Sequence, residues 1–170
     1  MSTQVVIDGT HEVGIATVSG PVDDTTLLAA LDQLYLSADW HPGYDAIWDG
    51  RGITKLVVDP AGSTGIARRV QSYASRIAAG RTAVVTQRTM DRLFAEMLFA
   101  RLRCPEQQYA LFDSMDSALL WAKGVERALR WKVNGAPSPA ATASRSNTPA
   151  VPAPPHAKRE PVDPHAAVLA

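Results

Sequence analysis

The sequence has 170 residues, with 17 basic and 17 acidic side chains and a formal net charge of zero. This balance argues against a protein whose whole surface binds DNA, RNA or an anionic membrane. No apolar run approaches the roughly 20 residues that span a bilayer, and the first residues lack the basic and apolar regions of a secretory signal. The single cysteine, Cys104, excludes an internal disulfide and a thiolate zinc site. We therefore expect a cytoplasmic protein without a membrane span or a nucleic-acid partner.

The composition changes near Val133, and this change divides the chain. Residues 133–170 hold 8 of the 12 prolines, and alanine, serine and threonine fill most of the remainder. Such a segment cannot bury enough apolar area to offset a backbone entropy of about 1–2 kcal/mol per residue. We expect one folded domain over residues 1–132, followed by a disordered Pro/Ala-rich tail over residues 133–170.

The first half of the domain alternates between strand and helix patterns. Two β-branched stretches, Gln4–Asp8 and Val13–Ser19, lie close enough together to predict a hairpin. Asp23 and Asp24 can accept hydrogen bonds at a helix start, and leucines at helical spacing follow as far as Tyr35. Tyr44–Asp49 reads as a short buried strand, and a polar loop containing glycine is expected after it.

The second half repeats this alternation. A helix is expected to start near Ser63 or Thr64 and to end at Gly80, where a left-handed residue is wanted. The remaining elements are a strand at Arg81–Thr86, a helix capped by Thr89 with Met90, Leu93, Phe94, Met97, Leu98 and Leu102 inside, a strand at Gln108–Phe112, and a helix from Ser114 through Val125. Strands that alternate with helices predict an α/β fold with a mainly parallel sheet of four or five strands, an N-terminal hairpin and about four helices.

This layout resembles the SpoIIAA-like proteins of the STAS group, which are named for sulphate transporters and anti-sigma-factor antagonists. The resemblance covers roughly residues 4–130, and two short stretches carry it: Trp48–Gly52, which ends a strand, and Phe112–Trp121, which joins the last strand to the last helix. It implies a sheet with helices mostly on one face. It also implies a non-enzymatic regulatory module that binds a protein or a small ligand and needs no cofactor.

In the anti-sigma-factor antagonists, a loop that reads roughly Asp-Ser-Ser-Gly at a helix start carries a phosphorylated serine. The matching segment here begins at Asp59 and contains Gly62, but Pro60 and Ala61 stand where the serines would be. Ser63 and Thr64 lie just beyond them. A shifted phosphorylation switch at Ser63 or Thr64 therefore stays open.

The loops at the carboxyl ends of the strands are the candidate binding surface, because ligands bind there in open α/β sheets. Asp49 and Arg51 leave one strand end, and the segment of Gly62, Ser63, Thr64 and Gly65 leads into a helix. A helix N-terminus with an arginine nearby suits a phosphate or a carboxylate. The alternative interpretation is that Asp49 and Ser63 satisfy local backbone donors and that the glycines only make turns.

Other chemistry is sparse in this sequence. Between Arg68 and Arg103 there are eight arginines against Asp91 and Glu96, a local net charge of +6 that is typical of a solvated helix face. No His–Cys spacing suits a metal, and no acid–base pair can be assembled for an enzyme. We expect a non-enzymatic module that binds a regulatory protein partner through the strand-end loops and the second helix. The alternative is a sensor of a small molecule or lipid, with an apolar or anionic ligand held between helix and sheet.

Overall fold

The structure is a computed structural model that describes residues 1–102 and 107–122. The chain divides into two units, Met1–Pro139 and Ala140–Ala170. The described residues all belong to the first unit. The expected tail lies outside the described residues, as do Cys104 and Val125.

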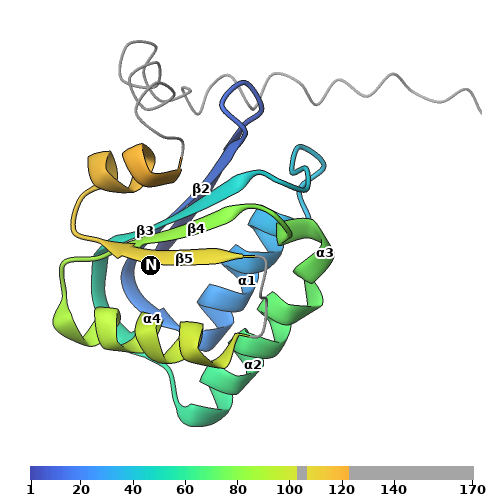
Figure 1. Ribbon diagram of the computed structural model, residues 1–170. Helices are drawn as coiled ribbons and strands as arrows, with labels where there is room; N and C mark the ends of the chain where they lie inside the picture. Colours follow the sequence, from blue (N-terminus) through green and yellow to red (C-terminus); the bar gives the residue numbers. More distant parts are fainter. Residues whose placement is uncertain (103–106, 123–170) are drawn as a thin grey trace, which may run out of the picture. The chain divides into compact units, whose positions relative to one another are not determined.

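The core of the first unit is one five-stranded mixed sheet (Figure 1). Its strands lie side by side in sequence order: β1 (Ser2–Asp8), β2 (Val13–Asp23), β3 (Asp45–Val57), β4 (Arg81–Val85) and β5 (Gln108–Phe112). The first two strands form an antiparallel hairpin, and every later pair is parallel. The predicted α/β class, with a mainly parallel sheet and an N-terminal hairpin, is confirmed.

Helices cover the two faces of this sheet unequally. Figure 1 shows the labelled helices mostly below the sheet and a short unlabelled helix, residues 115–122, above it. The labelled helices are α1 (Asp24–Tyr35), α2 (Pro60–Ser72), α3 (Ala74–Ile77) and α4 (Thr89–Arg101). Ala16 and Ala46 belong to the core on the side of α1, α2 and α3, whereas Ile47 and Ala83 belong to the core around residues 115–122. This division follows from the alternation of side chains along each strand.

Strand β3 is much longer than the sequence pattern predicts. It was expected to end at Asp49 and to lead into a loop, but it continues to Val57. The extension pairs with the far end of β2, from Ser19 opposite Gly52 to Asp23 opposite Val57, after an irregularity in the register. Gly50 and Gly52 suggest a loop, but the β-branched residues that follow them favour a strand, and pairing with β2 sets its register.

The second helix also differs from its prediction. It begins at Pro60, where the carboxylate of Asp59 accepts a hydrogen bond from the backbone N–H of Gly62 at 2.7 Å. It breaks at Tyr73 and does not run on to Gly80. The left-handed residue is Ala79, with φ of 63°. Gly80 is needed for a different reason, because a Cβ there would lie 2.3 Å from the carbonyl oxygen of Tyr44.

Helix α4 was predicted in the right place but with the wrong inner face. Its N-cap is Arg88 rather than Thr89, and no side chain makes the capping hydrogen bond. Met90, Leu93 and Met97, which were expected inside, are 68%, 47% and 52% exposed. Phe94, Leu98 and Leu102 lie on the inner side as predicted, and Asp91 and Ala95 take the inner positions that were expected for the methionines and Leu93.

The capping residue of the last helix was predicted correctly. The hydroxyl of Ser114 accepts a hydrogen bond from the backbone N–H of Ser117 at 3.3 Å, one turn into the helix. This bond satisfies one of the free donors at the helix start.

Candidate ligand cavity

A cavity of about 120 Å³ lies between α4 and the helix-covered face of the sheet. A single water needs roughly 10–15 Å³ on this measure, so the space holds several times that volume. Its walls come from α1, α2, α4 and strands β2 to β5. Strand β4 runs along it, because Thr82, Val84 and Thr86 all point to this face.

The middle of the cavity is apolar. Aromatic rings from β3 and α4 line it, together with aliphatic side chains from the sheet and from α1, α2 and α4. The apolar lining residues are Val18, Leu27, Leu31, Trp48, Ile53, Leu56, Ile66, Val70, Val84, Phe94, Ala95, Leu98, Phe99 and Leu102. A space of this composition favours an apolar molecule over a cluster of waters, which would need two to four polar partners each.

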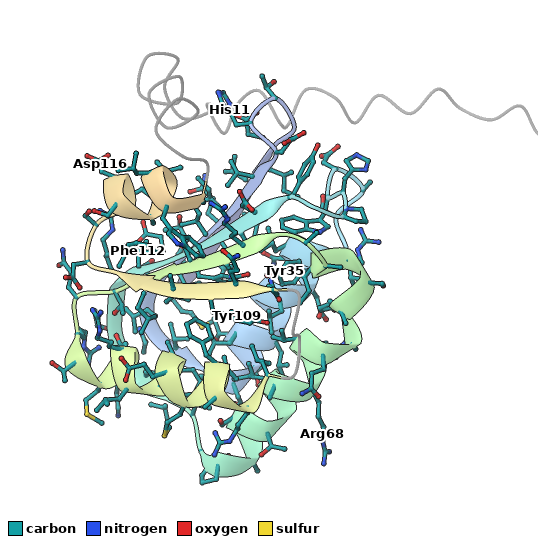
Figure 2. The ribbon with its side chains drawn as sticks, in the orientation of Figure 1. His11, Tyr35, Arg68, Tyr109, Phe112 and Asp116 are labelled. Carbon is teal, nitrogen blue, oxygen red and sulfur yellow. The ribbon has the colours of Figure 1, made fainter. Side chains whose placement is uncertain are left out.

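One end of the cavity carries a closed polar network. The side-chain amide of Gln107 donates to the hydroxyl of Thr82 at 2.7 Å, and the hydroxyl of Tyr109 donates to the amide oxygen of Gln107 at 2.6 Å. Tyr35 lies in the same layer, and burial raises its pKa to about 12. Figure 2 shows Tyr35 and Tyr109 between the sheet and the helices below it.

The other end of the cavity carries Asp91 in the first turn of α4. Its side chain is 5% exposed, and neither carboxylate oxygen has a hydrogen-bond partner within residues 1–102 and 107–122. The nearest cation is Arg88, whose Nε lies 3.8 Å from Oδ2. Burial raises the pKa of Asp91, and the charge of Arg88 partly opposes this rise. Thr82 and Thr86 are four residues apart on one strand, so the two ends are separated by roughly 13 Å.

Helix α4 is fastened to its neighbours by polar contacts at both ends. At its start, Arg88 Nη1 donates to the backbone oxygen of Ile53 at 3.1 Å. At its end, Arg101 Nη1 donates to the hydroxyl of Ser63 at 2.6 Å, and Gln71 Nε2 donates to the backbone oxygen of Arg101 at 3.3 Å. These contacts hold α4 across the cavity.

The predicted pair of Asp49 and Arg51 lies within β3, not in a loop. Arg51 donates to both carboxylate oxygens of Asp49, from Nε at 2.9 Å and from Nη2 at 2.8 Å. Burial alone would raise the pKa of Asp49, but the hydrogen bonds and charge of Arg51 bring it below its usual value. Asp49 also lines the cavity rim. The two side chains therefore satisfy each other.

The predicted segment at the start of α2 divides into buried and open positions. Ser63 is 4% exposed and holds Arg101, whereas Thr64 is exposed and its hydroxyl donates to the backbone oxygen of Pro60 at 2.9 Å. Gly62 lies against Asp24, where a Cβ would come within 2.9 Å, and Gly65 faces open space. The cavity residues Ile66 and Val70 follow on the inner side of the same helix.

The arginines predicted as a solvated face have structural roles at several positions. Arg81 Nη1 donates to the backbone oxygen of Trp121 at 2.6 Å, and Arg92 pairs with Asp113 at 2.8 Å. Figure 2 shows Arg68 pointing away from the body of the domain. Over residues 1–102 and 107–122, no three His, Cys, Asp or Glu side chains form a group that could hold a metal ion. Among these same residues, no helix combines the length and hydropathy that crossing a bilayer requires.

The sequence analysis missed Asp91 as a site residue. A signal was present, because Asp91, Phe94, Ala95 and Leu98 are spaced at i, i+3, i+4 and i+7 and so share one helix face. The neighbouring apolar residues Met90, Leu93 and Met97 form a competing stripe that looks more hydrophobic. Only packing against the sheet decides which stripe is buried.

Comparison with known proteins adds one similar structure. No family model matches the chain, and no curated protein matches it. A solved structure that is similar to it is an uncharacterized protein from the DUF3478 family with a SpoIIAA-like fold, from Shewanella loihica PV-4. The two chains are 11% identical, the alignment covers 71% of this chain and 92% of that one, and the TM-score is 0.49. The fold named for that protein is the one implied by the sequence resemblance.

Proposed function

We propose that this domain is a non-enzymatic binding module that holds a small, largely apolar molecule in the cavity between α4 and the sheet. The observation that carries the proposal is the cavity itself, which is lined by aromatic and aliphatic side chains between α4 and the sheet. Protein interiors normally pack to a density that leaves few voids larger than a water. A much larger apolar space is a default binding site.

The direct test is titration with naphthalene, an uncharged apolar probe, followed by two-dimensional NMR of the amide and indole groups. Trp48 and Phe94 line the cavity and should report binding. Leu98→Trp fills the cavity from α4 and should abolish the shifts. Leu93→Trp makes the same change on the exposed side of α4, where the side chain is 47% exposed, and should leave them unchanged.

The proposal fails if naphthalene shifts no cavity resonance, or if both tryptophan variants respond alike. Native mass spectrometry of protein purified from its own organism supplies an independent readout. A small molecule that is retained by the native protein and lost in Leu98→Trp supports the proposal.

A second candidate function is the recognition of a regulatory protein, as the sequence resemblance implies. The observation that favours it is the exposed apolar stripe of Met90, Leu93 and Met97 on α4, because exposed apolar patches often mark interaction surfaces. The exposed hydroxyl of Thr64 at the start of α2 is a modification point that a kinase can reach without moving α4. The buried hydroxyl of Ser63 is not.

This candidate is tested by comparing the partners of three proteins: the wild type, Thr64→Glu and the double variant Leu93→Ser, Met97→Ser. A protein that is captured by the wild type and lost in either variant supports it. Identical capture by all three proteins contradicts it.

A further inference from the structure

Asp91 is the one feature of the cavity that its structural surroundings leave unexplained. A buried carboxylate normally has several hydrogen-bond donors around it, because burying an unpaired charge is expensive. Here both oxygens lack a donor among the described residues, and the side chain is 5% exposed. Arg88 at 3.8 Å lies beyond hydrogen-bonding distance.

A structural role at the start of α4 does not account for this side chain. An acidic residue at a helix start usually bonds to a free backbone N–H, as Asp59 does for Gly62 at 2.7 Å in α2. Asp91 makes no such bond. It lines the cavity in place of an apolar residue that the surrounding walls would accommodate.

The two ends of the cavity differ in the hydrogen bonding that they leave available. At the far end, Thr82, Gln107 and Tyr109 bond to one another, so much of their capacity is already used. At the near end, Asp91 has two acceptor oxygens without donors. A ligand that donates a hydrogen bond would supply the missing donor at the Asp91 end and not at the Thr82 end. This asymmetry fixes the orientation of the ligand in the cavity.

We propose that the ligand is an apolar amine or alcohol whose N–H or O–H group donates to Asp91, with its apolar body extending along β4 toward Thr82. This inference rests on the proposed function of the cavity and specifies the ligand class. An apolar carboxylate is disfavoured, because it would place a second negative charge beside the first in a space with few donors.

The experiment compares three probes that share one chain, namely octylamine, octanol and octanoate, each titrated at pH 7 by the same NMR readout. We expect the amine and the alcohol to bind about tenfold or more tightly than octanoate, as befits hydrogen bonds to a charged acceptor. In Asp91→Leu this preference should disappear or reverse, while naphthalene still binds.

A second variant keeps the test valid if Asp91→Leu does not fold. Asp91→Asn keeps an acceptor oxygen and removes the charge, so octylamine, a cation, should lose more affinity than octanol does. Glu96→Gln is the matched control, because Glu96 lies on the outer side of the same helix and is 53% exposed. It should leave all three affinities unchanged.

The results separate this inference from the function on which it rests. If octanoate binds as tightly as the other probes, or if the preference survives in Asp91→Leu, the assignment of the ligand class is wrong. The same holds if naphthalene binds and none of the three chain probes does. If naphthalene itself fails to bind, the proposed function is wrong and this inference falls with it.

Discussion

Replacing Asp91 with leucine should stabilise the ligand-free protein. An orphaned buried acceptor costs about 1–3 kcal/mol, and more when it is charged. Leucine is close to aspartate in length and adds an apolar group to an apolar wall. The variant also loses a favourable interaction between a carboxylate and the start of α4, which is about 0.5 kcal/mol, and the ion pair with Arg88 at 3.8 Å, which is about 0.2–0.5 kcal/mol. The net gain in the free energy of unfolding at pH 7 is therefore roughly 1–2 kcal/mol, or roughly 3–6 °C in Tm.

The stabilisation should depend on pH with a definite sign. Because burial raises the folded-state pKa of Asp91 above 3.8, the ordinary value for aspartate, the folded protein binds this proton more tightly than the unfolded chain. The wild type is therefore relatively favoured at low pH and loses stability as pH rises from 3.8 through the folded-state pKa. The advantage of Asp91→Leu should shrink toward low pH and reach its full size above that window.

Urea denaturation at several pH values measures this difference directly. Glu96→Gln serves as the control, with an expected change within about 0.5 kcal/mol because the side chain is exposed. If Asp91→Leu is less stable than the wild type by 1 kcal/mol or more at pH 7, the carboxylate has a partner in the folded state. Asp91 would then not be an unsatisfied group that awaits a ligand.

Three further predictions concern the frame around the cavity. Gly80→Ala should destabilise the protein by about 1–3 kcal/mol, because its Cβ would meet the carbonyl oxygen of Tyr44 at 2.3 Å. Gly65→Ala lies in open space on α2 and should instead stabilise the protein by about 0.5–1 kcal/mol. Equal changes in Tm for the two variants would contradict the close approach at Gly80. Asp59→Ala removes the cap of α2 and should cost about 1 kcal/mol in urea denaturation, with no loss as the contrary result. Arg51→Ala should make unfolding begin at a higher pH in an acid titration, because Arg51 lowers the pKa of Asp49 in the folded state. The stability that this pair contributes is fully present above pH 3.8 and is lost as the pH falls through the folded-state pKa. An unchanged midpoint of acid unfolding would refute this role of Arg51.

The order and type of the elements could be predicted because their signals are local. Apolar spacing marked α1 and α4, and β-branched runs marked the hairpin. The start of α2 was also recoverable, since Asp59 followed by Pro60 is a strong signal for an N-cap and the first helical position. The prediction placed the start at Ser63 or Thr64, which can also cap a helix but lie inside its first turns here.

The remaining features depend on contacts between distant parts of the chain. The second half of β3 does contain strand-favouring residues, but Gly50 and Gly52 interrupt the pattern, and only pairing with β2 shows that one strand runs through both glycines. The cavity is a gap between elements, which no single element encodes. Asp91 became visible as a candidate only when its burial and its lack of donors were known.

The polar contacts at the two ends of α4 have a consequence for how the domain moves. A helix that spans a hollow buries less apolar area per residue than one packed directly on a sheet, so separating it from the sheet exposes little additional surface. Its local opening should therefore need less free energy than global unfolding. We expect the amides in the second half of α4 to exchange hydrogen faster than those of β2 and β3. Occupation of the cavity should slow this exchange in α4 more than elsewhere, and the rate at which α4 opens would then limit how fast a molecule enters.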